Sequence, residues 1–225
     1  MRRFPIAKEG LPYIFGLALL LVVFVLLGWT FLTILTLIAT LLVINFFRDP
    51  ERVIPQVPHA VLAPADGQVV FAGKAFEDRF LNSETLKISI FMSIFSVHVN
   101  RIPFSGEVES VHYEKGTFVA AHLDKASQKN EHNAVVLRIT GGKKIVFVQI
   151  AGLVARRIDC WLKPGDCVQR GERFGMIRFG SRLDIFVPGD SRLAISKGRY
   201  VRAGESILCY HQKNDKNGDA ESPER

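Results

Sequence analysis

The feature that most constrains the fold of this chain is a long run without charge near its N-terminus. Residues 11–47, a run of 37, contain no Asp, Glu, Lys or Arg, although the 225-residue chain carries 29 basic and 22 acidic residues. About 20 apolar helical residues cross a hydrocarbon core about 30 Å thick, so this run is too long for one upright helix and suits two short ones. A wholly soluble chain is excluded. A polytopic transporter is excluded too, since no second such run exists.

Residues 1–47 are therefore predicted to form a membrane anchor, a transmembrane helical hairpin that crosses twice or re-enters. The break at Gly28 is where the hairpin would turn. One tilted helix remains the alternative. A secretory signal peptide fits less well, because its apolar region stops near 15 residues. Basic residues flank both ends of the run, so the positive-inside rule predicts a cell-membrane protein with its following domain on the cytoplasmic side. These basic residues are Arg2, Arg3, Lys8, Arg48 and Arg52.

The remaining residues 48–213 are predicted to form a single β-rich domain. Short apolar runs rich in β-branched and aromatic residues recur between glycine-containing turns, a pattern typical of strands. These runs cover residues 67–73, 86–94, 134–139 and 144–150. Residues 214–225 are polar and are expected to be a disordered tail.

One internal repeat occurs in this domain. Residues 165–172 and 198–205 share the pattern G-x-x-V-x-x-G-E at an offset of 33. A valine between two glycine turns is typical of a strand-turn-strand unit, and paired units of this kind are similar to the hairpins of biotinyl/lipoyl-type sandwich folds. The fold class expected is therefore mainly β.

The cysteines and the distribution of charge limit the partners. Cys160, Cys167 and Cys209 are odd in number and lack CxxC spacing, which argues against a disulfide framework and against a metal site. Residues 156–202 hold 11 basic and 5 acidic side chains. An anionic membrane surface or lipid head group is the expected counter-charge, rather than nucleic acid, because the domain is tethered beside lipid. A merely solvated basic face is the alternative.

Between the two repeats, the strand-like stretch RFGSRLDIFVP at residues 178–188 contains the step Gly180-Ser181. On its own this dipeptide is an ordinary turn. Four further motifs occur in order along the chain: FRDPER at residues 47–52, APADG at 63–67, FSVHVNRIP at 95–103 and NEHN at 130–133. Together the five stretches resemble the phosphatidylserine decarboxylase proenzymes, in the short membrane-anchored class shared with the archaetidylserine decarboxylases.

The resemblance implies a self-cleaving enzyme. In that family the serine hydroxyl attacks the preceding carbonyl, here Ser181 and Gly180, and elimination then cuts the chain into residues 1–180 and 181–225. The serine becomes a pyruvoyl group, the cofactor that takes up the electrons left when CO2 departs from phosphatidylserine to give phosphatidylethanolamine. By the same resemblance His98 handles protons during decarboxylation and Asp66 assists self-cleavage. Taken alone, such a histidine is more often structural, and Asp-Gly is typical of a turn.

The sequence departs from the larger family members beside His98 and around the expected cut, where their Leu-Gly-Ser-Thr is here Phe-Gly-Ser-Arg at residues 179–182. They carry a second histidine three residues after the one that matches His98, whereas here Arg101 stands there. A guanidinium cannot accept the serine proton, so either His98 also acts in processing or another histidine does, with His132 the weaker candidate. A non-enzymatic membrane adaptor that binds a protein partner is the alternative function. The sequence leaves open whether the lipid is diacyl or ether-linked and whether the chain forms a homo-oligomer.

Overall fold

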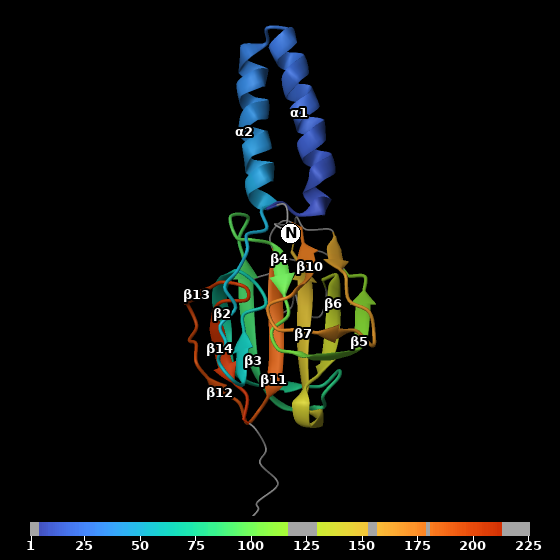
Figure 1. Cartoon of the computed structure of the whole chain (residues 1–225), viewed down its shortest axis with the longest axis vertical. Coiled ribbons are helices and arrows are strands. Elements are labelled where there is room, and N and C mark those ends of the chain that lie inside the picture. Colours follow the sequence, from blue (N-terminus) through green and yellow to red (C-terminus); the bar gives the residue numbers. More distant parts are fainter. Residues whose placement is uncertain (1–4, 117–129, 153–156, 179–180, 213–225) are drawn as a thin grey trace, which may run out of the picture.

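The computed structural model describes residues 5–116, 130–152, 157–178 and 181–212. The chain folds into a helical hairpin that projects from one end of a β domain (Figure 1). Strands dominate the secondary structure, so the expected mainly β class with an N-terminal apolar helical segment is confirmed. The tail expected over residues 214–225 lies outside the described residues.

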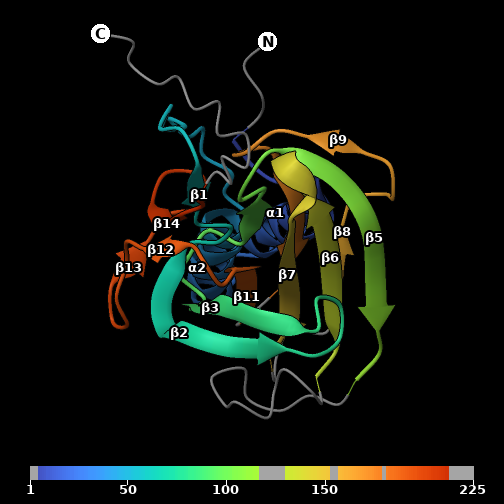
Figure 2. The same cartoon turned by 90° about the horizontal axis from the view of Figure 1, so that it is seen from below.

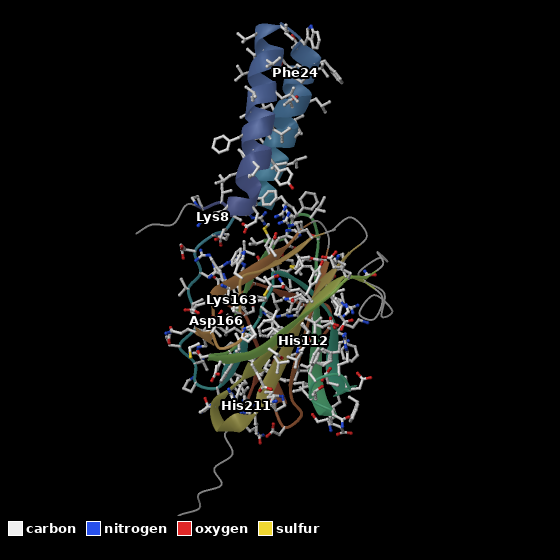
Figure 3. All side chains as sticks on the ribbon, turned by 90° about the vertical axis from the view of Figure 1, so that its right-hand side faces the viewer. Lys8, Phe24, His112, Lys163, Asp166 and His211 are labelled. Atoms are coloured by element: carbon white, nitrogen blue, oxygen red, sulfur yellow. The ribbon has the colours of Figure 1, made fainter. Side chains whose placement is uncertain are left out.

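The hairpin consists of α1 (Leu11–Leu26), preceded by the short 3-10 helix η1 (Lys8–Gly10), and α2 (Thr30–Phe46). The turn expected at Gly28 is confirmed, since this residue has a φ of 70° between the helices, a conformation that glycine adopts without strain. Among the described residues, Lys8–Leu26 is long and apolar enough to cross a membrane by length and composition, and Thr30–Phe46 is a shorter apolar helix. Figure 3 shows Lys8 at the base of the hairpin and Phe24 near its tip.

Backbone hydrogen bonds hold the two ends of the hairpin together. The Ala7 N–H donates to the Phe47 carbonyl at 2.8 Å, and the Asp49 N–H donates to the Pro5 carbonyl at 2.8 Å. The two helices therefore start and finish at the same end of the β domain, and most of their apolar side chains remain exposed. Exposed apolar helices of this length suit a lipid environment better than water.

The β domain contains a large sheet and two small ones. The eight-stranded sheet has the order β13-β2-β3-β11-β7-β6-β5-β9 and curls around the core, as Figure 2 shows. Its strands are β2 (Gly67–Glu77), β3 (Ser83–Met92), β5 (Gly106–Glu114), β6 (His132–Arg138), β7 (Lys144–Ala151), β9 (Cys167–Val168), β11 (Ser181–Pro188) and β13 (Tyr200–Val201). The small sheets are β1-β14-β12 and β4-β10-β8. Their strands are β1 (Ala60–Leu62), β4 (Val99–Arg101), β8 (Ile158–Cys160), β10 (Arg173–Ile177), β12 (Arg192–Leu193) and β14 (Ile207–Tyr210).

The centre of the large sheet is β11, paired with β3 and β7. Its alternate residues Leu183, Ile185 and Val187 are fully buried and belong to the main core. Because side chains alternate across a strand, Ser181 shares this inner face, whereas the residues between them point to the outer face. Odd-numbered residues of β11 therefore face the core and even-numbered residues face the outer side, and each residue that pairs with them lies on the same side as its partner.

The two sequence repeats lie at opposite edges of the large sheet. One copy supplies β9, which pairs with β5, and the other supplies β13, which pairs with β2. The copies make equivalent bonds, since the N–H groups of Gly165 and Gly198 donate to Val108 and Val69 at 2.7 Å. The repeat thus builds an internally related scaffold, as expected. Its closer likeness to biotinyl/lipoyl-type sandwiches stays a prediction.

Candidate functional site

Ser181 is the first residue of β11 and lies opposite Met92 of β3 and Ala151 of β7. It is completely buried, and its Oγ has no hydrogen-bond partner among the described residues. A buried hydroxyl normally finds a partner, because leaving one unpaired costs about 1–3 kcal/mol. This hydroxyl therefore does not contribute to the hydrogen bonds that stabilise the fold among the described residues. Gly180, the other expected cleavage-site residue, lies outside the described residues.

His98 immediately precedes β4 and is also completely buried. Its ring lies 4.1 Å from the ring of Phe46, centroid to centroid, at the end of α2. Neither ring nitrogen meets a hydrogen-bond partner of normal geometry among the described residues. Burial lowers the pKa of His98 to about 4; an interaction with the Ser96 backbone opposes this shift in part, and the positive charge of Arg48 adds to it. The imidazole is therefore neutral at pH 7 and able to accept a proton.

Both residues lie at the end of the β domain that carries the hairpin. On the Ser181 side, Arg178 donates to the hydroxyl of Tyr13 in α1 at 3.2 Å, three residues before the serine. On the His98 side, Val97 and Val99 pack in one cluster with the end of α2. The strand register thus brings these two expected site residues to the end of the fold from which the hairpin projects.

A chain of buried amides extends along the inner face beside Ser181. Gln149 lies opposite Leu183, which makes it a diagonal neighbour of Ser181, at about 7–8 Å by ordinary sheet geometry. Its Nε2 donates to Asn100 Oδ1 at 2.9 Å, and its Oε1 accepts from Asn133 at 3.1 Å. Asn100 Nδ2 in turn faces the sulfur of Met92 at 3.7 Å, a weak acceptor. These amides were not singled out from the sequence. The signal available there was a glutamine inside an otherwise apolar strand.

Asp66 is buried but is engaged elsewhere. Its carboxylate accepts from Arg52 at 2.8 Å and from the Ala203 N–H at 2.7 Å, and its described partners include neither Ser181 nor His98. In the other repeat-related half of the domain, Ser105 Oγ accepts from the Arg170 N–H at 3.0 Å. This equivalence indicates that the carboxylate holds a turn. It also forms an ion pair with Arg52, which the uncharged Ser105 hydroxyl cannot do. Its role in self-cleavage stays a prediction.

Arg101 and His132 also have defined structural partners. Arg101 donates to the carbonyls of Gly171 and Pro50, both at 2.9 Å, so it ties the segment after α2 to the β domain. His132 Nδ1 lies 2.7 Å from the Asn130 carbonyl, and its Nε2 lies 2.7 Å from a guanidinium nitrogen of Arg79. Because His132 pairs with Ile150, it faces the side of the sheet opposite to Ser181. The structure does not bring His132 to the serine.

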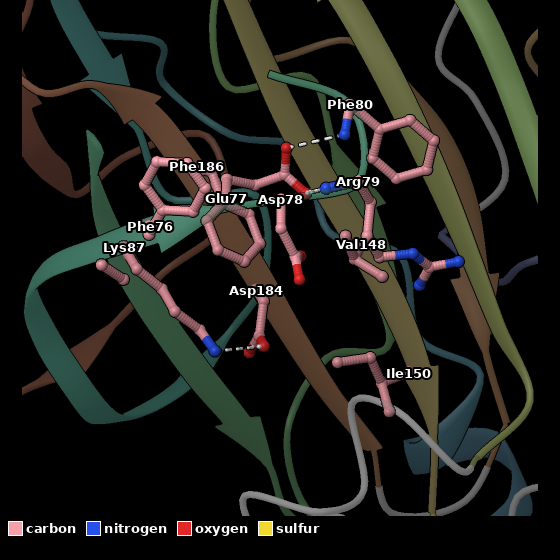
Figure 4. A pocket seen from close by; sticks show the side chains of 11 residues that line it. Phe76, Glu77, Asp78, Arg79, Phe80, Lys87, Val148, Ile150, Asp184 and Phe186 are labelled. Carbon is pink, nitrogen blue, oxygen red and sulfur yellow. Dashed lines mark hydrogen bonds and ion pairs between the residues drawn. The ribbon is translucent and has the colours of Figure 1, made fainter. Parts of the chain in front are cut away.

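A pocket of about 280 Å³ lies on the outer face of the same sheet (Figure 4). It is lined in part by Asp184 and Phe186, which alternate with the inner residues of β11, and Lys87 pairs with Asp184 at 3.1 Å. The sheet therefore separates this pocket from Ser181. The inner face at the hairpin end, and not this pocket, is the candidate site.

Comparisons with known proteins identify the family to which the chain belongs. The sequence model of the family described as phosphatidylserine decarboxylase matches residues 39–209. A phosphatidylserine decarboxylase proenzyme from Syntrophus aciditrophicus is 49% identical over 205 residues, which cover 90% of this chain and 96% of the relative. Proteins of the same name from Desulfotalea psychrophila and Cupriavidus taiwanensis are 48% and 49% identical, and each alignment covers 91% of this chain with 95% and 94% of the relative.

Family membership favours the decarboxylase over the alternative of a non-enzymatic adaptor. The relatives are named decarboxylase proenzymes, and the alignments cover 94–96% of their length. Ser181 and His98 both fall within the matched residues. The chain belongs to the phosphatidylserine decarboxylase family and is a decarboxylase.

Proposed function

We propose that this decarboxylase is made as a proenzyme, cuts itself between Gly180 and Ser181, and then converts phosphatidylserine into phosphatidylethanolamine and CO2. The observation that carries the proposal is the buried Ser181 hydroxyl without a hydrogen-bond partner among the described residues, in a chain whose relatives are named proenzymes. Only a serine suits this position, because its oxygen first attacks the carbonyl and then leaves.

Self-cleavage requires the hydroxyl to lose its proton as it attacks the Gly180 carbonyl carbon. The attack exchanges the Gly180–Ser181 amide bond for an ester, and the amide nitrogen takes up a proton. Loss of the Ser181 Cα proton then breaks the Cβ–Oγ bond by elimination, which frees chain 1–180 with a carboxylate end and leaves a dehydroalanine at residue 181. The dehydroalanine tautomerises, adds water and loses ammonia, which leaves a pyruvoyl group at the start of chain 181–225. This group supplies the electron sink for decarboxylation. The burial of Ser181 on the inner face is compatible with a pyruvoyl group at this position, since a ketone there is shielded from bulk water.

His98 is the proposed acid/base. A pKa of about 4 leaves its imidazole neutral at pH 7, so it can take a proton and hand it back at the reacting carbon during decarboxylation. Because Arg101 binds carbonyl groups and His132 faces the other side of the sheet, His98 is also the leading candidate for the base in self-cleavage. Asp66 stays a candidate for assisting that step, through the Arg52 ion pair that fixes its carboxylate.

The buried amides beside Ser181 are proposed to orient the polar head group. Asn100 and Gln149 provide N–H donors and carbonyl acceptors in a water-poor setting, where directed hydrogen bonds are stronger than in water. Among the described residues, Asn100 Nδ2 donates only to the Met92 sulfur, which is a weak acceptor, so a stronger acceptor on the head group can replace it.

The hairpin is proposed to cross the membrane twice and to place the β domain on the cytoplasmic face of the cell membrane. Basic side chains at both ends of the apolar run and the joined hairpin ends support this topology. An anionic phospholipid would then reach the site from the bilayer beside it. Association of two or more copies into a homo-oligomer stays a prediction.

The test is product formation from phosphatidylserine by the purified full-length chain. Ser181→Ala should abolish CO2 release, because no hydroxyl remains to start the processing. Ser191→Ala is the matched control, since Ser191 also has a buried Oγ without a hydrogen-bond partner among the described residues but lies beyond the other end of β11. Full activity of Ser181→Ala would contradict the proposal, and equal loss in both variants would too.

A further inference from the structure

A turn between β3 and β4 carries two exposed apolar side chains at its tip. Residues 93–96 form this turn, closed by a hydrogen bond from the Ser96 N–H to the Ser93 carbonyl at 3.0 Å. Ile94 and Phe95 occupy its two central positions and are 54% and 64% exposed. Central turn positions in water usually hold Pro, Gly, Asn or Asp. An Ile-Phe pair indicates that this tip meets something other than water.

The turn lies at the end of the β domain from which the hairpin projects. Arg48, two residues after α2, donates to the Phe95 carbonyl at 2.6 Å. Val97, just beyond the turn, packs in one cluster with Phe46 and Phe47. In Figure 1 the following strand, β4, lies directly below the hairpin. The exposed pair is therefore next to the base of α2.

The base of α1 has a similar surface. Trp161 is 43% exposed and lines a groove of about 620 Å³ together with the basic Lys8 and Arg173 and the acidic Glu9 and Asp49. Asp49 pairs with Arg173 at 2.7 Å, so Lys8 is the basic side chain of this groove that makes no ion pair among the described residues. Figure 3 shows Lys8 where the hairpin meets the domain. Apolar tips, an aromatic ring and basic side chains around the foot of apolar helices are the composition found at the head-group level of membranes.

We propose that Ile94, Phe95 and Trp161 form a lipid-contact rim, with which the β domain itself binds an anionic phospholipid bilayer. The turn of residues 93–96 dips its two apolar side chains into the boundary between head groups and acyl chains. This inference rests on the proposed membrane placement of the hairpin and goes beyond it, since it gives the catalytic domain a lipid contact of its own.

The rim has a consequence for the site. The turn joins Met92, the strand partner of Ser181, to the segment that carries His98. Insertion of the turn therefore sets the depth of both residues relative to the head groups. A phospholipid can then reach the inner face by a short movement out of the bilayer, with its acyl chains remaining in lipid.

Single-tryptophan probes in vesicles test the rim. Both native tryptophans of the full-length chain are first removed by Trp29→Phe and Trp161→Phe. One tryptophan is then introduced at a chosen position. Each variant is reconstituted into vesicles of phosphatidylglycerol and phosphatidylcholine, with or without brominated acyl chains. Phe95→Trp tests the turn. Phe76→Trp is the matched control. Phe76 is 60% exposed, but it pairs with Glu84 at the end of the β2–β3 pair that lies away from the turn of residues 93–96. Leu19→Trp in α1 reports on the hairpin.

The expected result is that brominated lipid quenches Phe95→Trp and Leu19→Trp several-fold more than Phe76→Trp, with a blue shift of the Phe95→Trp emission on reconstitution. Quenching of Leu19→Trp with a water-like, unquenched Phe95→Trp would overturn the rim and leave the hairpin placement intact. An unquenched Leu19→Trp would overturn the membrane placement and the rim with it. None of these readings depends on decarboxylation.

Discussion

The ring of Phe46, the last residue of α2, lies 4.1 Å from the ring of His98, centroid to centroid, so the hairpin touches the candidate acid/base directly. Phe46 is itself almost fully buried, and the two rings are tilted by 31°. The hairpin therefore also contributes to the candidate site. It supplies part of the apolar cover that keeps the imidazole away from water and holds its pKa low.

Removal of this cover should change how His98 titrates. In Phe46→Ala, water reaches the imidazole, and the pKa of His98 is expected to rise from about 4 toward the ordinary value of 6.5. An NMR titration of the His98 ring protons measures it. Phe31→Ala is the control, since Phe31 is an exposed residue near the start of α2. An unchanged His98 pKa in Phe46→Ala would show that other groups provide the shielding.

The same pKa predicts how stability depends on pH. His98 has a folded pKa of about 4 and an unfolded value of 6.5, so between these values the unfolded chain binds more protons. The free energy of unfolding contributed by this residue is fully present above pH 6.5 and is lost as the pH falls toward 4, by at most about 3 kcal/mol. Denaturation at pH 7 and pH 5 measures it. His98→Gln should flatten the slope, whereas His112→Gln, at an exposed site, should keep it.

His98→Ala separates processing from turnover. If His98 serves only decarboxylation, the variant is still cut, and CO2 release falls by about 10²–10⁴, the usual range for loss of a general acid/base. If it also serves as the processing base, the variant remains one chain. His132→Ala should be cut and active, because this ring faces the other side of the sheet. A fully cut His98→Ala that works at the unmodified rate would assign the histidine a structural role.

Asp66 can be tested against its repeat-related counterpart. Asp66→Ala should lower the free energy of unfolding by about 2–4 kcal/mol, because it leaves a buried Arg52 with a weaker set of partners. Ser105→Ala removes only the equivalent turn contact and should cost about 1 kcal/mol. Chemical denaturation compares the two.

Asp66→Asn addresses the processing role itself. The amide oxygen still accepts from the Ala203 N–H, but the negative charge is gone. Loss of cutting in a stable Asp66→Asn protein would support a part in self-cleavage. Normal cutting would limit Asp66 to holding the turn and the ion pair.

Local patterns in the sequence were enough to predict the hairpin, its turn at Gly28, the main strands and the glycine-bounded repeat, because each depends on neighbouring residues. They also pointed to Ser181 and His98 through the motifs around them. The structure places both at the hairpin end.

What the sequence did not predict depends on contacts between distant segments. The pairing of Arg52 with Asp66, the tilted contact of Phe46 with His98 and the amide chain through Gln149 each join segments that are separate along the chain. Such pairings are not encoded in any short window of residues. The face of the sheet that His132 occupies likewise required the register.

The proposed function depends above all on Ser181 as the residue at which the chain cuts itself and gains its cofactor. Intact-mass measurement of the purified, active protein tests this most directly. Two chains are expected, residues 1–180 and residues 181–225, with the smaller one blocked at its N-terminus, and a single chain is expected for Ser181→Ala. An active preparation that consists of one uncut chain of 225 residues would contradict it.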